Sequence, residues 1–163
     1  MLFPGFIISF ERGIENMDVK LVLDEELNKN KIVINCKEVD SKITRIKNFA
    51  EKVDITILGK NNNEKILISP EDIYYIESID KKTFIYLIDG VWECELRLYE
   101  LEEVLKGLTL IRISKNCIVN IRKVKKISLM INRNLMLKMD NDEGVIVSRR
   151  YVKKFNEFIG MEV

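Results

Sequence analysis

The chain has 163 residues, 47% of them hydrophobic, and a formal net charge of +1, which suits one domain with a proper core, or one domain with a small appendage. It contains no histidine, which removes histidine-based acid–base catalysis, histidine triads and histidine metal ligands. Its three cysteines are far apart and form no CxxC pair, which argues for a reducing compartment and against a disulfide framework or a zinc site.

Several other functional classes are disfavoured by what the sequence lacks. There is no Gly-rich phosphate loop and no nucleophile motif, so we predict that the protein is not an enzyme and uses no cofactor and no metal. No run of 18 or more apolar residues occurs, so we expect no membrane span and a cytoplasmic location.

Positive charge is concentrated in the C-terminal half of the chain. Residues 111–154 hold twelve Lys or Arg and three acidic residues, whereas residues 1–63 hold ten of each. Such clustering can create a directed basic patch without raising the isoelectric point of the whole chain.

The N-terminal third predicts a small unit of two strands and a helix. Residues 1–16 read as a disordered extension before a natural start at Met17, and residues 17–60 form the predicted ββα unit. Residues 19–23 and 32–36 alternate like strands. A unit of this size is too small to be stable alone, so we expect it to contact the rest of the chain or a second copy, which would make a homodimer.

The helix of this unit is predicted by a change of period. Apolar residues recur from Ile43 to Val53 at the spacing of an amphipathic helix, with Asp40 or Ser41 as its cap. Residues 59–64, GKNNNE, predict a turn or linker, and we place the domain boundary there.

The rest of the chain reads as strands with two short helices. Asp89-Gly90 predicts a type I′ hairpin that places Phe84, Tyr86 and Ile88 on the same face as Trp92 and Cys94. Strands are expected at 55–58, 66–68, 73–79, 84–88, 91–96, 110–113, 117–121, 124–131, 135–139 and 145–147, and helices at 98–108 and from Ser148 onward.

A polar step lies between two of these strands, at Ser114, Lys115 and Asn116. Loops held on rigid strands often carry binding residues. A basic side chain beside hydroxyl and amide groups suits phosphate and base-edge contacts. The alternative interpretation is a solvated basic strand of an ordinary sheet.

The start of the final helix has an unusual charge. Arg149 and Arg150 occupy its first turn, where the helix dipole favours anions instead. One remedy is a phosphate bound by the helix amides and the arginines, and the other is an ion pair with Asp140, Asp142 or Glu143. In the preceding helix, the acids Glu100, Glu102 and Glu103 are expected on a solvated face.

Four motifs in this order and spacing resemble the LytTR family of bacterial DNA-binding domains. They are PEDIYYIES at 70–78, LYELEEVL at 98–105, IRISKNCIVN at 111–120 and VSRRY at 147–151. The resemblance covers residues 64–160. It implies a mainly β (α+β) fold of small packed sheets with short helices, whose loops enter successive major grooves of double-stranded DNA. It also implies transcription regulation at paired imperfect repeats.

The resemblance also implies which residues contact DNA. They come from the loop after the first strand, from the polar step and from the start of the last helix. These residues are Lys81, Lys82, Thr83, Arg112, Ser114, Lys115, Asn116, Arg149, Arg150, Lys153 and Lys154. Asn120 is matched as well, but its place on a strand favours a structural hydrogen bond at least as much as a DNA contact.

The chain departs from the family at the polar step, which commonly reads His-Arg-Ser and is Ser114-Lys115-Asn116 here. Lys115 keeps the charge but lacks the fork of arginine, so bidentate guanine reading is weakened. The competing hypothesis is therefore a protein-interaction module with a basic face and little DNA specificity. The family's receiver domain is not expected, which places the chain in a stand-alone branch where a small membrane protein is one candidate partner.

Overall fold

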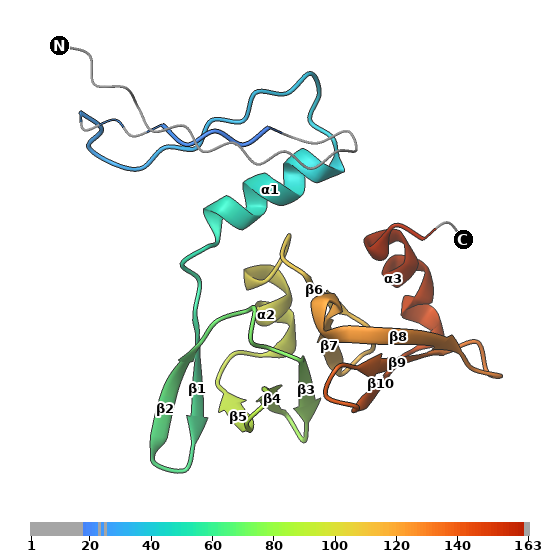
Figure 1. The fold of residues 1–163 in the computed structure, drawn as a ribbon. Helices are drawn as coiled ribbons and strands as arrows, with labels where there is room; N and C mark the ends of the chain where they lie inside the picture. Colours follow the sequence, from blue (N-terminus) through green and yellow to red (C-terminus); the bar gives the residue numbers. More distant parts are fainter. Residues whose placement is uncertain (1–17, 23, 25, 162–163) are drawn as a thin grey trace. The chain divides into compact units, whose positions relative to one another are not determined.

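The computed structural model describes residues 18–22, 24 and 26–161 (Figure 1). The chain divides into two compact units, residues 1–35 and 36–163. In the described part of the first unit, no helix or strand forms. The expectations for residues 1–16 and Met17 fall outside the described residues.

The prediction of two N-terminal strands is therefore wrong for the described residues 18–22 and 32–36. Val19, Leu21 and Ile32 leave 71%, 63% and 69% of their surface exposed. Alternation produces a stable strand only when another strand pairs with it and a surface covers its apolar face, and a lone hairpin is marginal in water.

The first helix of the second unit is α1 (Ser41–Glu51), which was predicted at this place in the chain but as part of the N-terminal ββα unit. The Asp40 carboxylate caps it by accepting a hydrogen bond from the backbone N–H of Ile43 at 2.8 Å. The helix has an apolar stripe, yet none of its residues is fully buried.

The end of α1 is hydrogen-bonded to the end of helix α2 (Leu98–Val104). The Lys52 ammonium donates to the carbonyl oxygens of Val104 and Lys106 at 2.8 and 2.6 Å, and so satisfies the C-terminal end of α2. Gly107 follows with a φ of +84°, and a Cβ there would lie 2.4 Å from the Asn48 side chain, so the approach requires glycine.

Seven antiparallel strands form the main sheet in the order β2-β1-β5-β4-β3-β7-β6. They are β1 (Ile57–Asn61), β2 (Glu64–Ile68), β3 (Tyr75–Ile79), β4 (Lys82–Tyr86), β5 (Val91–Cys94), β6 (Leu110–Arg112) and β7 (Cys117–Asn120). Residues 59–64, the expected domain boundary, contain the turn of the β1–β2 hairpin, and β1 also pairs with β5. Whether the two predicted domains are independent stays a prediction.

A second, smaller sheet follows in the order β10-β9-β8. Its strands are β8 (Val124–Leu129), β9 (Leu135–Met139) and β10 (Gly144–Val147), preceded by the 3₁₀ turn Ile121–Lys123. The chain then makes a 3₁₀ turn, Arg149–Tyr151, and continues into helix α3 (Val152–Ile159). This mostly β architecture with short helices confirms the predicted fold class.

Strand β7 joins two hydrophobic cores. Ile118 belongs to a core that includes Leu98 and Leu101 of α2. Its neighbours Cys117 and Val119 belong to a second core that includes Phe155 of α3 and the inner residues of the small sheet. Because alternate side chains of a strand point to opposite faces, the main sheet is covered on both sides in this region.

The hairpin at Asp89-Gly90 forms with a different register from the predicted one. Ile85 pairs with Trp92 and Thr83 with Cys94, so Phe84 and Tyr86 lie on the opposite face from Trp92. Neither Asp89 nor Gly90 has a positive φ, because the loop spans 87–90 and is not a two-residue type I′ turn. That turn geometry occurs instead at Asp80 and Lys81, whose φ values are 48° and 66°.

Phe155 should be the most costly side chain of α3 to truncate, since it is completely buried in the second core. We expect Phe155→Ala to lower the free energy of unfolding by about 3–5 kcal/mol in urea titrations. Phe158 lies on the same helix and is 36% exposed, so Phe158→Ala serves as the control. An equal loss for both variants would contradict this account of the second core.

Candidate nucleic-acid interface

Backbone hydrogen bonds bring the three predicted DNA-contact segments side by side. The N–H of Ser78, at the end of β3, donates to the carbonyl of Asn116 at 2.8 Å. The N–H of Ser148 donates to the carbonyl of Ile113 at 2.9 Å. The polar step therefore lies between the Asp80-Lys81 turn, which follows β3, and the start of the last helix. We call residues 80–82, 112–116 and 149–154 together the basic edge.

Most of the predicted contact residues present their side chains to solvent on this edge. Ser114 is half-buried. The exposed ones are Lys81, Lys82, Lys115, Asn116, Arg149, Arg150, Lys153 and Lys154. The Lys82 ammonium lies 3.0 Å from the Glu93 carboxylate on the neighbouring strand, with both side chains largely exposed. Pairs of this kind contribute little, so Lys82 stays available to an external anion.

Thr83 is placed differently from the expectation. It lies within β4 and not in the turn, and only 2% of its surface is exposed. Its side chain points to the same face as Ile85, where the first core lies. A residue in this position supports the fold, and a DNA contact of Thr83 stays an untested prediction that its burial does not favour.

Arg112 is not a free contact residue, because its guanidinium is used inside the protein. Nε donates to the carbonyl of Ser114 at 3.1 Å, and NH2 donates to the carbonyl of Lys115. The third nitrogen, NH1, lies 3.1 Å from the Glu102 carboxylate. With 18% of its side chain exposed, Arg112 shapes the polar step and does not face solvent.

The polar step also closes on itself. The Ser114 hydroxyl accepts a hydrogen bond from the backbone N–H of Asn116 at 3.0 Å. Together with the Arg112 bonds, this leaves the side chains of Lys115 and Asn116 exposed on a defined loop.

Glu102 binds two residues of the basic edge and is not on a solvated face as predicted. One oxygen lies 3.1 Å from Arg112 and the other lies 3.0 Å from the Lys154 ammonium, with 33% of the Glu102 side chain exposed. Glu100 is also used, since it accepts the backbone N–H of Arg97 at 2.7 Å at the start of α2. Of the three predicted surface acids, Glu103 alone fits that description, with 75% of its side chain exposed.

Of the two roles predicted for Asn120, a structural hydrogen bond and a DNA contact, the structure shows the first. Asn120 is completely buried. Its amide donates to the carbonyl of Ile73 at 2.9 Å, and its oxygen accepts from the Thr109 hydroxyl and the N–H of Arg122 at 2.8 and 3.1 Å. Cys117 is also buried, and this burial raises the pKa of its thiol to about 12.

Of the two predicted remedies for the charge at the start of the last helix, the described residues show no ion pair, and a bound phosphate stays a prediction. The N–H of Arg149 already donates to the Asn134 side chain at 2.8 Å, so this amide is not free for a phosphate. Asp142 pairs with Lys138 at 2.8 Å, and among the described residues neither Arg149 nor Arg150 takes part in an ion pair.

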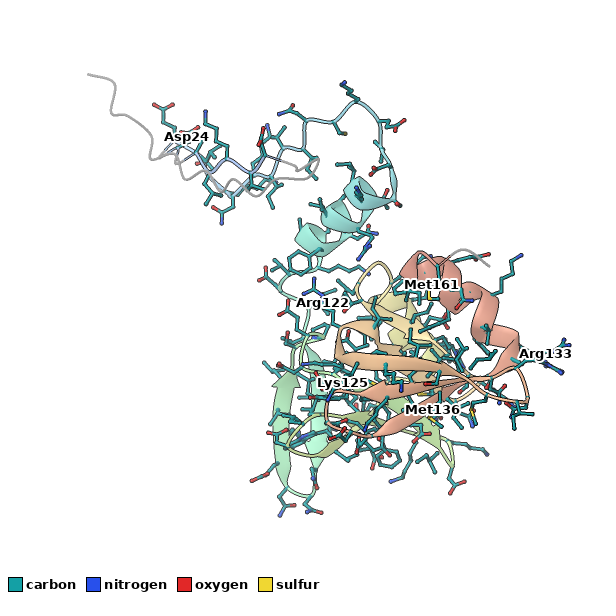
Figure 2. The ribbon with its side chains drawn as sticks, turned by 45° about the vertical axis from the view of Figure 1, so that its right-hand side comes forward. Asp24, Arg122, Lys125, Arg133, Met136 and Met161 are labelled. Atoms are coloured by element: carbon teal, nitrogen blue, oxygen red, sulfur yellow. The ribbon has the colours of Figure 1, made fainter. Side chains whose placement is uncertain are left out.

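The turn between β8 and β9 was not predicted as part of the site. It holds Asn134 against Arg149, and the neighbouring Arg133 is exposed with a φ of 61°. Figure 2 shows Arg133 projecting from this turn, away from the body of the small sheet. The sequence could have indicated Arg133, because it is the last of seven basic residues between positions 111 and 133.

Residues 63–160 match the family model of the LytTr DNA-binding domain. The chain belongs to the LytTR family. A solved LytTr DNA-binding domain from Bacillus cereus superposes with a TM-score of 0.63 at 28% identity, covering 65% of this chain and 97% of that one.

Two relatives are similar to the LytTR part of the chain. The sensory transduction protein LytT of Enterococcus faecalis is 30% identical over 95 residues, which are 58% of this chain and 39% of LytT. The transcriptional regulatory protein YpdB of Escherichia coli K12 is 30% identical over 99 residues, covering 60% and 41%. The matched part thus spans about two fifths of either relative.

An uncharacterised HTH-type transcriptional regulator of Staphylococcus aureus NCTC 8325 is 27% identical over 143 residues, covering 86% of this chain and 97% of its own. Its match therefore extends well beyond the LytTr domain. No helix in the described part of our chain is both long and apolar enough to cross a membrane.

Truncation of Asn120 should cost far more stability than truncation of Asn116. We expect Asn120→Ala to lower the free energy of unfolding by about 2 kcal/mol or more, because it strands several buried polar groups. Asn116→Ala should change it by less than about 0.5 kcal/mol, as for most exposed positions. Chemical denaturation measures both, and a larger loss for Asn116→Ala would refute the structural role of Asn120.

The Glu102 bridge should contribute to stability in a pH-dependent way. Burial alone would raise the pKa of the Glu102 carboxyl, but the hydrogen bonds and charges of Lys154 and Arg112 outweigh it and hold this pKa below its ordinary value. The contribution is therefore complete above the unfolded pKa of about 4.3 and is lost as pH falls through the lower folded pKa.

The measurement is urea unfolding of the wild type and Glu102→Gln between pH 7 and 3. We expect a difference that is constant at higher pH and shrinks below about pH 4. Glu103→Gln, one residue along the same helix, should show no such change. A difference that grows on acidification would contradict the lowered pKa.

Proposed function

We propose that this protein is a sequence-specific transcriptional regulator that binds double-stranded DNA through the basic edge. The observation that carries the proposal is the pair of backbone hydrogen bonds, from Ser78 and Ser148, that places the other two basic segments beside the segment with the polar step. The names of LytT and YpdB, a sensory transduction protein and a transcriptional regulatory protein, support the same class of function.

The exposed side chains divide into two roles in this proposal. Lys81, Lys82, Arg149 and Lys153 would bind phosphates, which gives affinity and fixes the register on the duplex. Lys115, Asn116 and Arg150 would read base edges in the major groove, where Lys and Arg suit guanine and Asn suits adenine. The three segments together would enter successive major grooves at repeated sites.

A second candidate is a protein-interaction module, favoured by the polar step, where Lys115 lacks the guanidinium fork. Exposed apolar residues such as Val19, Leu21 and Ile32 in the first unit also offer surface to a partner. The partner in this second candidate would be a second copy of the chain or a small membrane protein, as predicted from the sequence.

The decisive experiment mixes the full-length protein with sheared DNA from its source genome and sequences the fragments it retains at moderate salt. A regulator should recover a few promoter fragments that share a repeated motif with half-sites about one helical turn apart. Uniform recovery that disappears with salt would indicate only a basic surface and would favour the interaction module.

Point variants then test the division of roles. Lys153→Ala should weaken all DNA about equally and flatten the salt dependence by about one unit of slope. Lys115→Ala or Arg150→Ala should relax discrimination at particular base pairs by about 1–3 kcal/mol each. Equal losses on selected and random DNA for all three variants would refute these assignments.

A further inference from the structure

We infer that Glu102 is a specificity-determining residue of the basic edge, acting as a positioning residue for the polar step and as an internal counter-ion for Lys154. The inference rests on the proposed DNA-binding function. It assigns a role in DNA recognition to an acidic side chain that makes no contact with DNA.

The geometry shows that both oxygens of this carboxylate are used, each by a different cation. Oε2 lies 3.1 Å from NH1 of Arg112 on β6, and Oε1 lies 3.0 Å from Nζ of Lys154 on α3. Glu102 thereby joins α2 to two of the three segments that make the basic edge. The two partners are separated from it by ten and 52 residues along the chain.

The first effect is on the shape of the polar step. A guanidinium is planar, so a carboxylate that fixes one of its nitrogens also orients the other two. Those nitrogens hold the carbonyls of Ser114 and Lys115. Without the charge of Glu102, Arg112 would be free to turn toward a DNA phosphate and release the loop that carries Lys115 and Asn116.

The second effect is on the positive charge that binds DNA of any sequence. Each phosphate neutralised by Lys or Arg adds affinity for any DNA through counter-ion release. Lys154 is paired at 3.0 Å with Glu102, which is less exposed than the Glu93 partner of Lys82 and is also held by Arg112, so this pair belongs to a network. Its neighbour Lys153 reaches only 4.0 Å from Glu157 at a more exposed position. Glu102 also repels phosphates itself. It therefore lowers sequence-independent affinity while it preserves the loop that reads bases.

The test uses the full-length chain with a fragment recovered in the genomic selection and a random duplex of equal length. We expect Glu102→Gln to bind random DNA about three- to tenfold more tightly at moderate salt, with a salt slope steeper by about one unit. Because a loosened polar step forfeits part of any gain on the selected fragment, the ratio of selected to random affinity should fall. Glu103→Gln is the matched control and should change neither affinity by more than about twofold.

A second pair of variants keeps the test decisive if Glu102→Gln folds poorly. Lys154→Ala should leave the salt slope nearly unchanged because Lys154 is already neutralised within the protein, while Lys153→Ala should flatten it by about one unit. Thermal unfolding without DNA identifies any variant that is not folded at the assay temperature.

Each outcome has one meaning. An unchanged affinity ratio for a folded Glu102→Gln, or a flattened slope for Lys154→Ala, would overturn the role of Glu102. If the wild type itself shows no preference for the selected fragment, the proposed regulatory function fails first, before any variant is compared.

Discussion

The burial of β7 on both faces is the constraint on which the rest of the structure depends. Ile118 faces one core and Cys117 and Val119 face the other, so neither face of this strand can shift without opening a core. The polar step enters β7 directly at Cys117. A loop attached to a strand fixed from two sides has little freedom of its own, which is how a small β domain can present side chains in a defined register.

The charges of the basic edge show how affinity and structure compete for the same side chains. Arg112 and Lys154 would both suit phosphate, but the structure uses one to fold the polar step and neutralises the other with Glu102. Lys115, Arg149 and Arg150 are left for an external partner. Charge counted along a sequence therefore overstates the charge that a folded surface presents.

Features governed by near neighbours could be predicted from the sequence. The cap of α1 by Asp40, three residues from the N–H that it accepts, follows from local chemistry and spacing. The structural role of Asn120 was one of two predictions, but its distant partner, the carbonyl of Ile73, was not predicted. Features that depend on distant pairs could not, such as the Glu102–Lys154 bridge across 52 residues. Thr83 was misplaced because the turn before β4 contains only Asp80 and Lys81, so Thr83 lies within the strand. The N-terminal strands failed because, among the described residues, no strand pairs with their alternating residues.

Lys52, at the end of α1, connects that helix to the C-terminal end of α2. The Lys52 ammonium binds the carbonyls of Val104, the last residue of α2, and of Lys106 just beyond it. Glu102, within the same seven-residue helix, binds Arg112 and Lys154. The C-terminal turn of α2 therefore connects α1 to the surface that we assign to DNA. Thermodynamic linkage then makes any coupling through it reciprocal: a ligand that moves α1 and alters DNA affinity must itself be bound more tightly or more weakly, by the same factor, once DNA is present.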